Sequence, residues 1–248
     1  CDPGMGGRIA SDRNEILEFE WNDLCMLQDL IKKNDKKIAC IILTPYHHPS
    51  FAPSELPADD FWSTVRNLCD ERDIALILDD VRCGGRLSGG GSHCYFDFTP
   101  DLSVYSKALG NGYAISACVG NEKFKDSSME VFLTGSCWND AVAMKAALMS
   151  LEISSRDSVP ENVIHKGSYF CQKLEEVSLK NNLPLRMTGP QSMPYPWIEG
   201  DENLFMIQKF SKFCALEGLF FHPHHNWFIS NAHTNESLDY SLDKAGSV

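Results

Sequence analysis

Apolar residues in this chain gather in short continuous runs, separated by stretches with helical periodicity. The runs at 37–43 ("KIACIIL") and 74–78 ("IALIL") are too short for helices and do not alternate with polar residues, so they predict buried strands. Residues 59–70 between them predict a helix, and so do residues 23–31, for which Asn22 is the expected N-cap. This strand–helix–strand order predicts an α/β fold with a mainly parallel sheet and helices on both faces.

The rest of the chain alternates predicted helices and short strands. Helices are expected at 138–153, 160–179, 202–217 and 236–245, and strands at 102–105, 115–119, 131–133 and 218–230. After about residue 155 the strands mix with only one or two covering helices. We therefore expect an α/β domain over residues 1–154 and a small C-terminal α+β domain over residues 155–248.

Composition narrows the function classes. A formal net charge of −12 and a pI near 5.0 argue against nucleic acid or an anionic membrane as a partner, although a local basic pocket for a small anion remains compatible. No apolar run approaches the ~18 residues of a membrane span. The ten cysteines have no regular spacing and no CxxC pair, which indicates reduced thiols in a cytoplasmic compartment, with an organelle as the alternative. Because the chain begins with Cys1, we expect it to be part of a longer protein.

Two charged residues follow buried strands. Asp79 comes directly after the strand at 74–78, and Lys107 follows the one at 102–105. The carboxyl ends of parallel strands are where open sheets bind ligands. Taken alone, Asp79 could simply turn the chain and Lys107 could be a surface lysine. An aspartate pair would also suit magnesium or phosphoryl transfer, but no GxxxxGK[ST] loop or GxGxxG turn supports nucleotide binding. A lysine nucleophile together with a buried carboxylate is what pyridoxal phosphate (PLP) chemistry requires.

The surrounding motifs resemble those of a known family. "LILDDVRCGGR" followed by "FDFTPDLSVYSKALGNGYAISACVG" resembles the core of the class III aminotransferases, which are PLP enzymes of fold type I. The resemblance is closest to glutamate-1-semialdehyde aminomutase and its aminotransferase-like relatives. It extends to "TGPQSMPY" and "GLFFHPHHNWFISNAHT" near the C-terminus. It implies the fold type I architecture, PLP as cofactor, and a homodimer whose subunits share their active sites.

The resemblance also implies residue roles. Asp79 would bind the pyridine nitrogen, Val81 would pack against the cofactor ring, and Lys107 would form the Schiff base and then shuttle a proton. Ser136, flanked by Thr134, would reach the phosphate of the partner subunit's cofactor. From the sequence alone, Ser136 could equally cap the helix predicted to begin at 138.

Two arginines bear on the identity of the substrate, and so do two positions at which the sequence differs from the family pattern. Arg82 stands where the family often has Gln or Met, and Arg86 could bind a substrate carboxylate through its planar fork, or be a solvated or structural arginine. Asp80 replaces the usual Glu, and Cys83 stands where Thr is common. These differences leave the substrate open. The family's N-terminal region, with its phosphate loop and a ring-stacking aromatic residue, has no counterpart in these residues.

The histidines form two groups that invite a metal-site interpretation. One group is His222, His224 and His225, and the other is His47 and His48. Pro223 interrupts the first group, and no nearby cysteine or carboxylate completes a ligand shell. We expect no metal site.

These observations predict a PLP-dependent aminotransferase. It would move an amino group between an amino acid or amine and a keto acid, aldehyde or semialdehyde through Lys107. One alternative is a glutamate-1-semialdehyde-type 2,1-aminomutase. An alternative of another class is a catalytically silent, truncated paralogue that serves as a binding or structural protein. The expected partners are a small-molecule amino donor, a carbonyl acceptor and a second copy of the chain.

Overall fold

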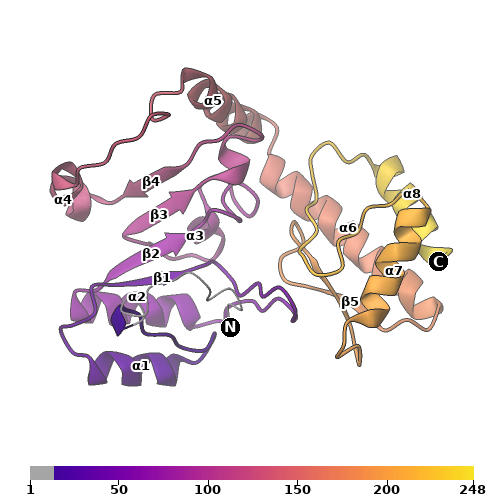
Figure 1. Cartoon of the computed structure of the whole chain (residues 1–248), viewed down its shortest axis with the longest axis horizontal. Helices are drawn as coiled ribbons and strands as arrows, with labels where there is room; N and C mark the ends of the chain where they lie inside the picture. The colour runs from indigo at the N-terminus through magenta and orange to yellow at the C-terminus, as the bar shows by residue number, and fades with distance from the viewer. Residues whose placement is uncertain (1–13) are drawn as a thin grey trace.

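The computed structural model describes residues 14–248 and has two lobes joined by a long helix (Figure 1). The first lobe contains a four-stranded sheet in the order β1–β2–β3–β4. Its strands are β1 (Cys40–Leu43), β2 (Ala75–Asp79), β3 (Leu102–Tyr105) and β4 (Ala117–Gly120). The first three strands are parallel and β4 runs antiparallel to β3. The predicted strands of the first lobe are thus confirmed, apart from residues 131–133, which form no strand.

Three helices of the first lobe lie close to the predicted positions, namely α1 (Leu24–Lys33), α2 (Phe61–Arg72) and α5 (Ala141–Arg156). The short helices α3 (Ser92–Tyr95) and α4 (Lys125–Glu130) were not predicted. The expected cap of α1 was wrong by one residue. Asp23 accepts from Met26 N at 2.8 Å, whereas Asn22 has a φ of 63° and bonds through its side chain to the loop at 55–58.

A hydrophobic core joins α1 and α2 to one face of the sheet. Leu27 and Ile31 of α1 meet α2 and the strands there. In β1, Ile41 is buried on this face, while its neighbour Ile42 points the other way and is 61% exposed. Trp62 of α2 stacks on Phe98 with ring centroids 3.9 Å apart. Because these side chains are buried, they fix the position and register of the strands. The same strands carry the polar residues of the candidate site.

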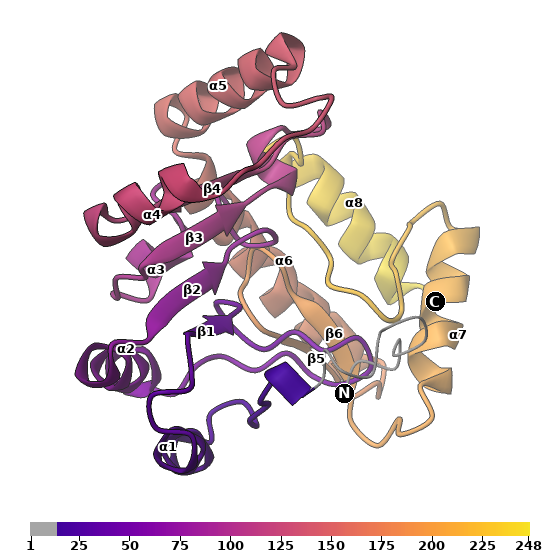
Figure 2. The ribbon, with the colours of Figure 1, turned by 60° about the vertical axis from the view of Figure 1, so that its left-hand side comes forward.

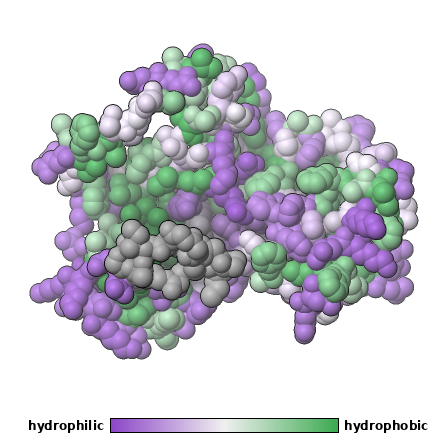
Figure 3. All heavy atoms as spheres, viewed as in Figure 1, coloured by the Kyte–Doolittle hydropathy of each residue, from purple (hydrophilic) through white to green (hydrophobic). Residues whose placement is uncertain are grey.

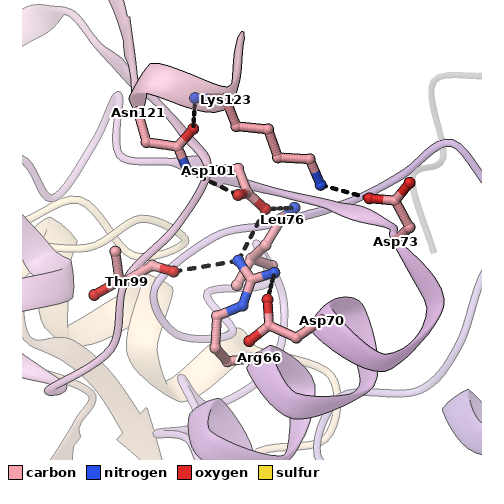
Figure 4. A network of polar contacts seen from close by, with 8 residues as sticks. All are labelled: Arg66, Asp70, Asp73, Leu76, Thr99, Asp101, Asn121 and Lys123. Carbon is pink, nitrogen blue, oxygen red and sulfur yellow. Dashed lines mark hydrogen bonds and ion pairs between the residues drawn. The ribbon is translucent and has the colours of Figure 1, made fainter.

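A polar network ties the opposite, amino-terminal edge of β2 and β3 together (Figure 4). Asp101, which directly precedes β3, accepts hydrogen bonds from Leu76 N at 2.8 Å, from Arg66 Nη1 at 2.8 Å and from Asn121 Nδ2 at 2.9 Å. Arg66 also pairs with Asp70 at 2.7 Å. Burial alone would raise the pKa of Asp101, but these donors hold it below its ordinary value. The network therefore joins α2, β2, β3 and the end of β4 through one carboxylate.

The second lobe is built on the long helix α6 (Val159–Lys180). It also contains the antiparallel pair β5 (Leu185–Thr188) and β6 (Tyr195–Ile198), and the helices α7 (Phe205–Leu216) and α8 (Asn235–Gly246). These elements enclose a separate core that runs from Val163 to Ala245 (Figure 2). The division into domains over residues 1–154 and 155–248 stays a prediction.

The strand expected at 218–230 was wrong. Trp227 N and Ile229 N donate to Pro194 O and Ser192 O, at 2.8 and 3.1 Å, so the segment runs beside the chain that leads into β6. Pro223 has no N–H to donate, and the structure assigns no strand ladder there. The result is an ordered loop rather than a third strand.

Among residues 14–248, no helix is both long and apolar enough to cross a membrane. Every cysteine in the same range is free.

Candidate active site

Asp79 is the last residue of β2, at the carboxyl edge of the parallel strands. In the sheet it pairs with Val104 of β3, three residues before Lys107. The Asp79 carboxylate accepts one hydrogen bond, from Val81 N at 3.2 Å, and no cation lies within 4 Å of it among the described residues. This leaves acceptor capacity on the carboxylate for a ligand.

Lys107 begins a short 3₁₀ helix, Lys107–Leu109, directly after β3. Its φ of 48° is in the left-handed region, which a residue with a Cβ adopts only under constraint and which is frequent at functional sites. Ser106 Oγ donates to Ile115 O at 2.9 Å, and Ser150 Oγ of α5 donates to Ala108 O at 3.0 Å. The turn is therefore held on both sides of Lys107, whose side chain is exposed and has no ion-pair partner in the described part of the chain.

Glycine closes this turn. A Cβ on Gly110 would lie 2.1 Å from Tyr113 O, so any other residue there would force the backbone apart. The sequence run "KALGNG" thus keeps the lysine next to a tight turn.

Asp80 anchors the loop that follows β2. Its side chain is completely buried and accepts from Ser92 N at 2.8 Å and from Ser92 Oγ. Burial raises the pKa of Asp80, and the two Ser92 bonds oppose that rise. A Cβ on Gly84 would lie 2.6 Å from the ring of Tyr105, so the loop packs directly on the end of β3. The loop from 81 to 91 is consequently fixed against the carboxyl ends of β2 and β3.

The second lobe reaches this loop through residues 222–229. Arg82 Nη1 donates to Asn226 Oδ1 at 2.6 Å, and Asn226 Nδ2 donates to Met193 O at 3.0 Å. The Arg86 guanidinium lies over the ring of Phe228, 4.7 Å from its centroid. The sequence did not single out Asn226 or Phe228, because their partners lie far away along the chain. The run of three histidines nearby was the only signal that this loop carries polar side chains.

Burial shapes the electrostatics around Cys83. The thiol is buried, and burial first, then the charges of Asp80 and Asp79, raise its pKa, while Arg82 and Arg86 oppose the rise. Because burial and the two carboxylates raise its pKa, the Cys83 thiol stays protonated.

His48 is neutral and is influenced by Arg82, one of the two arginines described above. Burial, and then the charge of Arg82, lower the pKa of His48 to about 4. Its Nε2 is buried and has no hydrogen-bond partner among the residues that the structure describes. His48 packs edge-on against Tyr46, with ring centroids 5.3 Å apart.

Thr134 and Ser136 lie in the exposed segment between α4 and α5. The capping alternative for Ser136 was wrong, because α5 begins at Ala141 and Asp140 caps it by accepting from Val142 N at 3.0 Å. The structure does not bring Thr134 or Ser136 into contact with Asp79 or Lys107. Their predicted place at a partner's cofactor stays a prediction.

The histidine groups form no cation site in the described residues. There, no cluster of three or more His, Cys, Asp or Glu side chains could hold a metal ion. The ring centroids of His222 and His225 are 5.9 Å apart, and those of His222 and His224 are 6.4 Å apart.

Comparison with known proteins completes this picture. The sequence profile of the family described as "Aminotransferase class-III" matches residues 9–190. The chain belongs to this family. Its fold is accordingly that of the PLP-dependent enzymes of fold type I.

Two curated relatives match almost the whole chain. An aminopentol aminotransferase of Sphingopyxis macrogoltabida is 35% identical over 97% of this chain, and a 3-aminobutyryl-CoA aminotransferase of Cloacimonas acidaminovorans is 34% identical over 98%. A glutamate-1-semialdehyde 2,1-aminomutase of Acetivibrio thermocellus is 27% identical. The chain spans only 57%, 60% and 59% of these three relatives.

Solved structures agree. The "PLP internal aldimine form" of the FumI protein of Sphingopyxis sp. MTA144 matches 99% of this chain, with a TM-score of 0.96 and 35% identity, over 59% of its own length. An omega-transaminase of Sphaerobacter thermophilus matches with a TM-score of 0.86 at 19% identity, which shows the shared fold.

Proposed function

We propose that this chain is part of a PLP-dependent aminotransferase that moves an amino group between an amino acid or amine and a keto acid, aldehyde or semialdehyde. One observation carries the proposal. Asp79 and Lys107 lie at the carboxyl ends of adjacent strands, and Lys107 is held in a left-handed conformation by bonds on both sides. The fold supports it, because fold type I enzymes use such a pair to hold one cofactor.

The side chains present fit pyridoxal phosphate. Asp79 has free acceptor capacity for a protonated pyridine nitrogen, and Val81 lies beside it to cover a ring face. Lys107 offers an exposed amine that no described carboxylate engages. When bound, the cofactor supplies an electron sink for the bonds at the amino-bearing carbon.

Each residue would then have a separate task. The charge of Asp79 would keep the pyridine nitrogen protonated. Lys107 Nζ would hold the cofactor covalently and later move the proton between the substrate carbon and the cofactor. Asp80 and Ser92 would keep Asp79 in place, because they fix the backbone that follows it.

A homodimer with shared active sites is part of the proposal. Apolar side chains gather over α4, α5 and the segment between them (Figure 3). The exposed ones include Met129, Val131, Phe132, Leu133, Trp138, Val142, Leu148 and Leu151. An apolar surface of this extent marks an interaction site. Thr134 and Ser136 lie within it, as expected for residues that reach the phosphate of a partner's cofactor.

The relatives favour an aminotransferase over an aminomutase. Those at 34% and 35% identity are named aminotransferases, whereas the aminomutases are at 26% and 27%. We also propose a reducing, cytoplasmic compartment, which the free and partly exposed cysteines support.

The test uses the full-length protein incubated with PLP. We expect it to convert a keto acid such as pyruvate into its amino acid only when an amine donor is added, and we expect Lys107→Ala to abolish the conversion. An aminomutase would instead isomerise one substrate without an external acceptor. A silent paralogue would bind PLP weakly or not at all and give neither product.

A further inference from the structure

Two arginines at the candidate active site have no carboxylate partner among residues 14–248. Four of the six arginines in residues 14–248 pair with an Asp or Glu within 4 Å, namely Arg66, Arg72, Arg156 and Arg186. The two exceptions, Arg82 and Arg86, both lie in the loop after β2. In a chain with a net charge of −12, unpaired arginines concentrated in one place need an explanation.

Arg82 is already engaged by neutral groups. Its Nη1 donates to Asn226 Oδ1 at 2.6 Å, and Asn226 is itself buried and fixed by Met193 O. This bond joins the two lobes across 144 positions of sequence. We therefore assign Arg82 to the contact between lobes.

Arg86 has a different environment. Its Nε donates to Arg82 O at 3.2 Å, and its guanidinium lies over the Phe228 ring. These two contacts fix the plane of the guanidinium but use neither terminal nitrogen, and no protein acceptor for those nitrogens is present among the described residues. One edge of the planar fork therefore has no acceptor in the described part of the chain, and such a fork can receive a carboxylate through two parallel hydrogen bonds.

Burial adds a second argument. Removal from water lowers the pKa of Arg86, but an arginine stays charged in a protein, so the group remains a partly buried cation with no anion beside it in the part of the chain that the structure describes. Such a charge is stabilised when an anionic ligand binds beside it. Arg86 lies in the loop that follows Asp79, because Gly84 N donates to Asp80 O at 2.9 Å and Arg86 N donates to Cys83 O at 2.9 Å, so the guanidinium is held close to the end of β2.

We propose that Arg86 binds a carboxylate of the substrate, and that Arg82, Asn226 and Phe228 are positioning residues that hold its guanidinium in place. The proposal deepens the proposed function and rests on it for the identity of the ligand as a substrate. Because these four residues form two contacts between the lobes, Arg82 with Asn226 and Arg86 with Phe228, the carboxylate site would form only when the lobes are in contact.

The test measures equilibrium binding of butyrate and of its uncharged isostere butyramide by calorimetry, on full-length protein with and without PLP. We expect butyrate to bind in the millimolar range and butyramide not to bind detectably. Arg86→Gln should weaken butyrate about tenfold to a hundredfold, since a charge-assisted, two-pronged contact is lost. Arg86→Lys, which keeps the charge without the fork, should fall between. Circular dichroism checks that each variant is folded.

Two comparison variants locate the effect. Arg82→Gln should weaken butyrate less than Arg86→Gln does, because it acts only through position. Arg186→Gln, which removes an arginine from β5 that pairs with Glu199 at 3.3 Å, should leave binding unchanged.

Three results would overturn the proposal: no binding of butyrate, equal binding of butyrate and butyramide, or equal affinity in wild type and Arg86→Gln. Measuring butyrate binding to the protein without PLP distinguishes failure of this proposal from failure of the proposed function. Failure to take up PLP would contradict the aminotransferase, whereas unchanged butyrate binding in Arg86→Gln would contradict only the role of Arg86.

Discussion

Replacing Asp101 by Asn removes one negative charge from the network that joins α2 to the starts of β2 and β3 (Figure 4). The carboxylate receives Arg66 and Leu76 N on one oxygen and Asn121 on the other. An amide has only one acceptor oxygen, so in either orientation of Asn at least one of these donors would face an NH₂ group. The variant therefore loses both an ion pair and a hydrogen bond inside the lobe.

The expected magnitude follows from burial. The Arg66 and Asp101 side chains are 17% and 8% exposed and their atoms lie 2.8 Å apart. Breaking a buried pair costs about 3–5 kcal/mol, and Arg66 keeps Asp70 as a second partner, so we expect a loss of about 3 kcal/mol. The matched control is Asp70→Asn. Asp70 pairs with the same arginine but is 66% exposed, and its loss should cost less than about 1 kcal/mol.

Urea unfolding of the two variants and the wild type at several pH values is the assay. Because the folded-state pKa of Asp101 lies below 3.8, its stabilisation is fully present above that pH and is lost as the pH falls through the lowered pKa. The difference between wild type and Asp101→Asn should thus be constant near neutrality and shrink in acid. Equal stability losses for Asp101→Asn and Asp70→Asn would refute the reasoning.

Two further predictions concern Ser92 and His48. Ser92→Ala removes the hydroxyl that donates to the buried Asp80, so unfolding in urea should show a loss of about 2 kcal/mol. Ser63→Ala, whose exposed hydroxyl bonds only to a backbone carbonyl, should lose less than half of that, and equal losses would contradict a special role for Ser92. The lowered pKa of His48 means that the unfolded chain takes up its proton first, so stability should fall as the pH drops from 6.5 towards 4, by up to about 3 kcal/mol. His48→Gln should flatten that part of the pH profile, and an unchanged slope would show that His48 is not the group responsible.

Hydrophobic pattern alone predicted most of the elements, because burial sets the strand and helix positions. The predicted helix at 160–179 corresponds to α6 (Val159–Lys180), and the run at 74–78 became β2. The pattern failed where apolar residues are not buried by this chain. At 131–133 the side chains are exposed and no described strand pairs with the segment, so its high β propensity does not produce a strand.

The candidate site was only partly visible in the sequence. Asp79 and Lys107 follow recognisable strands, so their shared edge could be expected. The roles of Asn226 and Phe228 depend on contacts across two lobes, which no local pattern encodes. For the same reason, the sequence could not distinguish Arg82, which bonds to Asn226, from Arg86, whose fork is open.

The central claim is that Lys107 carries the cofactor. Full-length protein would be incubated with PLP, reduced with borohydride and digested, and its peptides would be analysed by mass spectrometry. We predict a single pyridoxyl adduct on Lys107, with exposed lysines such as Lys123 unmodified at stoichiometric PLP. An unmodified Lys107, or an adduct spread over several lysines and retained in Lys107→Ala, would contradict the account.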